Sequence, residues 1–250
     1  MNVLVKMSLT GKRLDLKGIK LDLKGTKYDG PWDIRFKTSF NCIVHGPSGT
    51  GKTTFVRNLL TLRELMFTTP PAKVILFYNM HQLIYEEMKN ETLVDELINV
   101  SSNFPSLEEI VNMVHPYKDS GGSLLIFDDV LTQLNPDFER IFCNLSHHEN
   151  ASVIFMSQNL FYRSGIYRTL SLNAHYFVFM KNDRDKQQIS TLARQICPGN
   201  SEYIVQAYEE ATKKPYSYLV ADFRPDTPPT IRLRSHLFPS ECPTVVYLEK

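Results

Sequence analysis

Short apolar segments alternate with longer amphipathic segments along most of this 250-residue chain. Most of the apolar segments are continuous hydrophobic runs, which is typical of strands covered on both faces. The predicted strands are 40–45, 74–78, 124–127, 153–156, 176–180 and 218–221, and the predicted helices are 53–66, 82–89, 107–115, 136–145 and 186–195. This alternation predicts an α/β fold with a largely parallel central sheet and right-handed crossovers.

The two ends of the chain depart from this pattern. Residues 14–27 form a tandem heptad, LDLKGIK followed by LDLKGTK, in which leucines alternate with polar residues. Residues 1–30 contain seven Lys or Arg and three Asp, so they carry a net charge of +4 against −3 for the remainder. We therefore predict a basic N-terminal arm at 1–30, one domain at 31–225 and a proline-rich, extended C-terminal tail at 226–250.

Composition excludes several classes of protein. A hydrophobic content of 42% with 22% charged residues is that of a globular protein, and a net charge of +1 excludes a polycation held on nucleic acid by bulk charge. No apolar run reaches the roughly 18 residues of a membrane span, and lysines from Lys6 onward interrupt any secretory signal. Four scattered cysteines indicate free thiols in a reducing compartment, and a zinc site at Cys143, His147 and His148 lacks a second ligand pair. We expect an intracellular protein that is not secreted.

The segment 46–53, GPSGTGKT, fits the phosphate-binding pattern G-x-x-x-x-G-K-[ST] between a predicted strand and a predicted helix. Glycines let backbone N–H groups surround a phosphate, and the helix N-terminus adds partial positive charge. Lys52 is predicted to reach the β- and γ-phosphates of ATP, and the Thr53 hydroxyl to bind Mg²⁺. The domain at 31–225 is therefore predicted to be a P-loop ATPase. Its predicted nucleotide-binding residues are Gly46, Pro47, Ser48, Gly49, Thr50, Gly51, Lys52, Thr53 and Thr54.

Polar side chains also follow the apolar strands 124–127 and 153–156. After the first come Asp128 and Asp129, at the carboxyl edge where open α/β sheets bind ligands. Asp128 is predicted to hold Mg²⁺ through its water shell, and Asp129 to orient the attacking water. Gln158 follows the second strand and is predicted to sense the γ-phosphate, provided that this strand inserts between those of Lys52 and Asp128. A helix cap or turn at 157–159 is the alternative.

Several arginines follow the predicted sensor strand. An arginine inserted from a neighbouring subunit stabilises the charge of phosphoryl transfer. Arg168 is the preferred candidate, ahead of Arg184 and Arg163, and an ordinary surface arginine is the alternative at each position. The segment 181–183, Lys-Asn-Asp, has the wrong order for the Asn-Lys-x-Asp motif that recognises guanine, which favours ATP.

With these residues in place, the chain resembles the genome-packaging ATPases of double-stranded DNA viruses in the FtsK/HerA-like superfamily. The resemblance is strongest to the short forms of Polinton- and adintovirus-like viruses and to the related poxvirus packaging ATPases. It rests on the phosphate loop, on 125–129 and on the segments 146–148, 158–161, 168–175 and 181–185. Two positions depart from the pattern: Asp129 stands where cellular relatives usually have Glu, and Asp183 where proline is expected. Residues 1–30 match nothing in the family.

The resemblance implies a three-layer RecA/ASCE-like ATPase that uses ATP and Mg²⁺ and assembles as a homo-oligomeric ring, hexameric or pentameric. It implies that the ring translocates double-stranded DNA without sequence specificity into a preformed capsid, in contact with capsid vertex proteins. The expected location is the virus assembly site, in the host nucleus or a cytoplasmic factory, with the virion as a second location. Two alternatives stay open: a helicase or replication-initiator ATPase, and a non-hydrolysing, ATP-dependent scaffold for capsid assembly.

Overall fold

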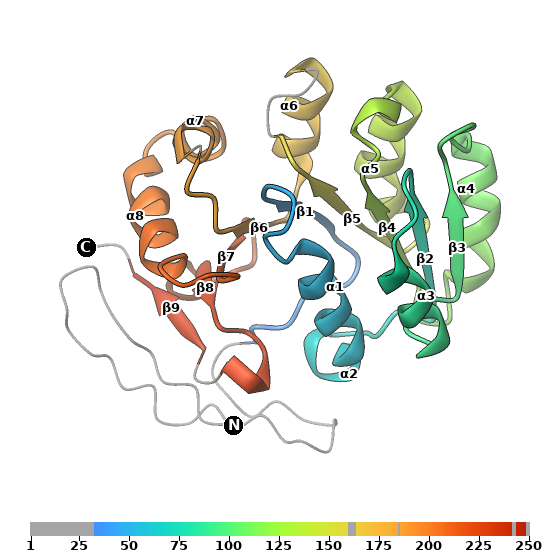
Figure 1. The fold of residues 1–250 in the computed structure, drawn as a ribbon, viewed down its shortest axis with the longest axis horizontal. Helices are drawn as coiled ribbons and strands as arrows, with labels where there is room; N and C mark the ends of the chain where they lie inside the picture. The colour runs from blue at the N-terminus through green and yellow to red at the C-terminus, as the bar shows by residue number, and fades with distance from the viewer. Residues whose placement is uncertain (1–32, 160–163, 185, 242–243, 249–250) are drawn as a thin grey trace. The chain divides into compact units, whose positions relative to one another are not determined.

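A computed structural model describes residues 33–159, 164–184, 186–241 and 244–248 (Figure 1). The chain divides into two compact units. Of the described residues, the parallel-sheet unit comprises those in Phe36–His45 and Lys52–His175, and the antiparallel-sheet unit comprises those up to Arg35, those in Gly46–Gly51 and those from Tyr176 onward. The basic arm predicted at 1–30 lies outside the described residues.

No helix in the described part of the chain is long and apolar enough to cross a membrane.

The sheet of the parallel-sheet unit has the strand order β3-β2-β4-β5-β1, and every neighbouring pair is parallel. Its strands are β1 (Asn41–His45), β2 (Lys73–Tyr78), β3 (Glu96–Asn99), β4 (Ser123–Asp128) and β5 (Ala151–Ser157). β1, β4 and β5 are buried along their whole length, which explains their continuous apolar sequences. β5 pairs with β1 on one side and β4 on the other, so the predicted insertion of this strand is confirmed.

Helices cover both faces of this sheet (Figure 1). One face carries α1 (Lys52–Thr61), α2 (Arg63–Met66) and α3 (Leu83–Asn90), and the other carries α4 (Leu107–Val114), α5 (Pro136–His148) and α6 (Ser164–Asn173). Right-handed crossovers require this division, because the chain moves along the sheet one way from β1 to β3 and the other way from β3 to β5. The helix predicted at 53–66 is in fact two helices, since the chain departs from helical geometry at Leu62.

Aromatic rings join α5 to the sheet just beneath the carboxyl ends of its strands. Phe77 of β2 stacks on Phe127 of β4, with ring centroids 4.6 Å apart. Phe138 of α5 meets the rings of Phe127 and Phe155 edge-on, both at 5.1 Å. Burying each such ring contributes about 1.5–3 kcal/mol. The polar residues that follow β4 and β5 are therefore attached to strands that are held firmly in place.

The antiparallel-sheet unit contains β6 (Tyr176–Met180), β7 (Tyr218–Asp222), β8 (Leu233–Ser235) and β9 (Val245–Tyr247), paired antiparallel in that order. Its helices, α7 (Lys186–Ile196) and α8 (Ser201–Ala211), pack on each other. Arg234 and Asp222 form a buried ion pair at 3.1 Å between β8 and β7. β8 and β9 arise from the segment expected to be an extended tail.

Short 3₁₀ helices lie in both units, at His115–Tyr117 and Leu131–Gln133 in the parallel-sheet unit and at Pro229–Ile231 and Pro239–Glu241 in the antiparallel-sheet unit.

Candidate functional site

The phosphate-loop motif forms a glycine-dependent turn after β1. Gly49 and Gly51 have φ angles of +77° and +95°, in the left-handed region that residues with a side chain rarely adopt. The Thr50 hydroxyl donates a hydrogen bond of 2.8 Å to the carbonyl of Pro47 and closes the turn. Lys52, the residue that follows the loop, is the first residue of α1. Glycine loops of this form bind phosphate through their backbone N–H groups.

The first two residues of α1 face the end of β4. The Thr53 hydroxyl donates a hydrogen bond of 3.3 Å to Oδ2 of Asp128. Lys52 is buried, with 7% of its surface exposed. Burial lowers the pKa of the Lys52 ammonium, and the negative charges of Asp128 and Asp129 oppose that shift. A cation, a hydroxyl and two carboxylates thus share one site, although their motifs are about 75 residues apart in sequence.

Asp128 is the buried acid of this site, with 4% of its surface exposed. Its Oδ2 atom accepts a second hydrogen bond, of 2.8 Å, from the hydroxyl of Tyr85 on α3. Burial raises the pKa of Asp128, whereas the Tyr85 hydrogen bond and the charge of Lys52 lower it. The Thr53 and Tyr85 hydroxyls both donate to Oδ2, and Oδ1 accepts no side-chain hydrogen bond from the described residues. The pair of donors therefore fixes the orientation of the carboxylate.

Asp129 and Gln158 lie beside this acid. Asp129 has a φ angle of +57°, in the left-handed region that is uncommon for residues other than glycine but that Asp and Asn adopt more readily than most. Nε2 of Gln158 lies 3.5 Å from Oδ1 of Asp129, at the limit of a hydrogen bond. The Ser157 hydroxyl donates to the carbonyl of Asn159 at 2.9 Å, so the chain also turns here. The amide and the second acid come from the neighbouring strands β5 and β4 and meet at one edge of the sheet.

Among the described residues, Arg168 forms no hydrogen bond or ion pair with this cluster. Arg168 is exposed on α6, where its carbonyl accepts a hydrogen bond from the Ser171 hydroxyl. Arg184 is exposed in the antiparallel-sheet unit, and Arg163 lies outside the described residues. Thr54 is exposed on α1. The structure thus brings together Lys52, Thr53, Asp128, Asp129 and Gln158 in the parallel-sheet unit.

Tyr85 is the residue of this site that the sequence did not reveal. It belongs to no motif, and only its place with Met88 on the buried face of α3 distinguishes it from other tyrosines. Burial, followed by the charge of Asp128, raises the pKa of the Tyr85 hydroxyl far above its ordinary value. The hydroxyl therefore stays protonated and remains a hydrogen-bond donor throughout the physiological pH range.

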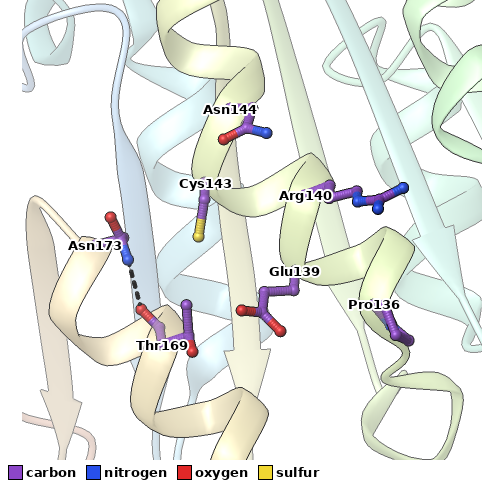
Figure 2. A pocket seen from close by; sticks show the side chains of 7 residues that line it. All are labelled: Pro136, Glu139, Arg140, Cys143, Asn144, Thr169 and Asn173. Carbon is purple, nitrogen blue, oxygen red and sulfur yellow. Dashed lines mark hydrogen bonds between the residues drawn. The ribbon is translucent and has the colours of Figure 1, made fainter.

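A separate hollow of about 310 Å³ lies between α5 and α6 (Figure 2). Arg140 points away from Cys143, and the Asn173 side chain donates a hydrogen bond of 2.9 Å to the carbonyl of Thr169. Burial raises the pKa of the Cys143 thiol to about 11, so this sulfur stays protonated and is a weak nucleophile. None of the predicted nucleotide-site residues lines this hollow.

Comparison with solved structures finds the same fold in the genome-packaging NTPase B204 of Sulfolobus turreted icosahedral virus 2. Its complex with sulfate matches with a TM-score of 0.52 and 12% identity, over 80% of this chain and 96% of B204. Its complex with ATP-γS matches with a TM-score of 0.50 and 13% identity, over 76% of this chain and 94% of B204. No protein-family model and no curated protein matches the sequence. The predicted class, an α/β P-loop NTPase fold of the kind found in viral packaging ATPases, is confirmed.

Proposed function

We propose that this protein is a P-loop ATPase that hydrolyses ATP. The observation that carries the proposal is the hydrogen bond between Thr53 and Asp128. It joins the hydroxyl that ends the phosphate-loop motif to the buried acid at the end of β4, which is the pair of oxygen donors that a nucleotide-bound Mg²⁺ requires. The fold shared with B204, which was solved with ATP-γS, supports the proposal.

The residues of the site fit the divalent ion. Hard cations prefer carboxylate and hydroxyl oxygens, and Thr53 and Asp128 offer both within 3.3 Å of each other. When bound, the ion would neutralise charge on the phosphate oxygens. We assign the phosphates to the backbone N–H groups of Gly46–Gly51 and the start of α1, with Lys52 at the β- and γ-phosphates.

Asp129 and Gln158 are the residues proposed to act on the attacking water. Asp129 lies next to the buried acid and is half-exposed, so it can accept a hydrogen bond from an attacking water and take its proton. Gln158, 3.5 Å from Asp129, can hold the same water from the adjacent strand. Arg168 is exposed on α6, where a neighbouring subunit could present it in trans to stabilise the transition state.

We further propose that hydrolysis drives translocation of double-stranded DNA into a capsid by a hexameric or pentameric ring, in contact with capsid vertex proteins. The fold shared with a viral packaging NTPase and the sequence resemblance both support this proposal. Such a motor contacts the phosphate backbone, so DNA binding should be independent of sequence and sensitive to salt. Residues 1–30, with a net charge of +4, are proposed as a basic arm that adds backbone contacts.

Phosphate release measured with and without blunt duplex DNA tests the proposal. Lys52→Ala should lower the turnover of ATP about 100- to 1,000-fold, because it removes a preorganised cation at the developing charge. Lys89→Ala, at an exposed position of α3, is the matched control and should keep full activity. Unchanged turnover in the Lys52 variant would refute the nucleotide site.

Two further measurements separate the packaging motor from its rivals. Movement along blunt duplex without strand displacement supports a translocase, whereas displacement of a strand supports a helicase. ATP binding without multiple turnovers would identify a scaffold.

A further inference from the structure

A pocket adjoins the phosphate loop within the antiparallel-sheet unit. Its volume is about 330 Å³, within the range of small-molecule sites. Three segments line it: the loop residues 47–50, the segment 181–184 that follows β6, and Pro215 and Tyr216 just before β7. A ligand whose phosphates lie on the loop would have this pocket within its reach.

Tyr216 is the unusual residue of this pocket. It is a large aromatic residue with 70% of its surface exposed, so burial does not explain its position. Its φ angle is +60°, in the left-handed region that costs free energy for a bulky side chain. The ring nevertheless lies against the loop, because a methyl group placed on Gly51 would be 3.6 Å from its Cδ1 atom. The backbone thus holds an exposed aromatic face beside the phosphate loop at an energetic cost.

Two hydrogen bonds from Lys181 hold the chain on either side of this tyrosine. The N–H of Lys181 donates to the carbonyl of Ser217 at 3.0 Å, and the Lys181 ammonium donates to the carbonyl of Lys213 at 3.2 Å. The turn that carries Tyr216 is therefore tied to the end of β6. The loop is packed against that same end, since a methyl group on Gly46 would lie 2.6 Å from Cβ of Met180. The aromatic ring and the phosphate loop are both held to β6.

We propose that this pocket binds the base of the nucleotide, with Tyr216 as the surface on which the base stacks. The inference rests on the proposed function, because it presumes that the triphosphate lies on the loop. An aromatic face stacks on any base, so Tyr216 adds affinity and gives little discrimination among bases. The polar groups around it include those of segment 181–184, where the Asn182 side chain accepts a hydrogen bond of 3.0 Å from the N–H of Arg184.

The decisive experiment compares ATP with inorganic tripolyphosphate, which has no base. Dissociation constants of both are measured with the full chain and with two variants, Tyr216→Asn and Tyr216→Phe. Asn tolerates the left-handed backbone, so Tyr216→Asn removes the ring while keeping the turn. Loss of one stacked base should weaken ATP binding about 5- to 150-fold and leave tripolyphosphate binding unchanged. Tyr216→Phe keeps the ring and should bind both ligands as the unaltered protein does.

Each other outcome overturns the inference in a recognisable way. Unchanged ATP affinity in Tyr216→Asn would show that the ring does not touch the base. An equal loss for ATP and tripolyphosphate would show that Tyr216 only shapes the loop. If the unaltered protein bound tripolyphosphate as tightly as ATP, the base would have no pocket, although the phosphate site would stand. If the unaltered protein bound neither ATP nor tripolyphosphate, the proposed function itself would be wrong.

Discussion

Tyr85→Phe removes one oxygen atom and with it the hydrogen bond to the buried acid. The Tyr85 side chain is fully buried, and its hydroxyl lies 2.8 Å from Oδ2 of Asp128. Phenylalanine keeps the ring and its packing. The variant therefore isolates the polar contact between α3 and the end of β4 from the hydrophobic contribution of the side chain.

The size of the effect follows from the burial and charge of the acceptor. A hydrogen bond to a charged group contributes about 1.5–3 kcal/mol, and the carboxylate that remains would have only the Thr53 hydroxyl as its side-chain donor among the described residues. We expect the free energy of unfolding at pH 7 to fall by about 1.5–3 kcal/mol. The Tyr85 hydrogen bond also lowers the pKa of Asp128, so this pKa should rise further in the variant. The acidic limb of the ATPase pH profile should shift to higher pH accordingly.

Urea denaturation followed by circular dichroism measures the change, with the same denaturant slope expected for both proteins. Tyr78→Phe is the matched control, because the Tyr78 ring packs 5.3 Å from that of Tyr85 and its hydroxyl makes no hydrogen bond within the described part of the chain. The control should stay within about 0.5 kcal/mol of the unaltered protein. If Tyr85→Phe were no less stable than Tyr78→Phe, the hydrogen bond would not support the acid and the reasoning would be refuted.

Two further predictions concern the acids. Asp129→Asn should retain ATP binding, measured at equilibrium, and lower the turnover number, measured by phosphate release, about 100- to 10,000-fold. Full turnover in this variant would exclude Asp129 as the base. Asp128→Asn should abolish hydrolysis but raise the free energy of unfolding of the nucleotide-free protein at pH 7, because burial raises the pKa of Asp128 and makes its charged form unfavourable. The contribution of Asp128 to the free energy of unfolding falls as pH rises from 3.8, the ordinary pKa of Asp, through its raised pKa. The difference in stability between the variant and the unaltered protein should therefore shrink as pH is lowered through that range. A variant less stable than the unaltered protein at pH 7 would contradict this.

The long buried strands of the parallel-sheet unit were predictable, because a strand covered on both faces must be apolar throughout. β1, β4 and β5 meet that condition and were found within two residues of their ends. β3 is short and only partly buried, and β8 and β9 have three residues each, so none shows a readable periodicity. The antiparallel pairing of β6 with β7 could not be predicted either, because an apolar run does not determine the direction of the strand beside it.

For the candidate site, the sequence alone predicted a set of residues from their local spacing: the glycine loop, Lys52 and Thr53, the paired acids and Gln158. These motifs place backbone N–H groups, charges and hydroxyls through a few consecutive bonds. Only the tertiary structure brought Thr53 to Asp128, Tyr85 to the same carboxylate, and Tyr216 to the glycine loop. The physical reason is that these contacts arise from how helices and turns pack against strand ends. Packing depends on the shape and burial of the whole unit, and the spacing of neighbouring residues in the sequence does not determine either of them.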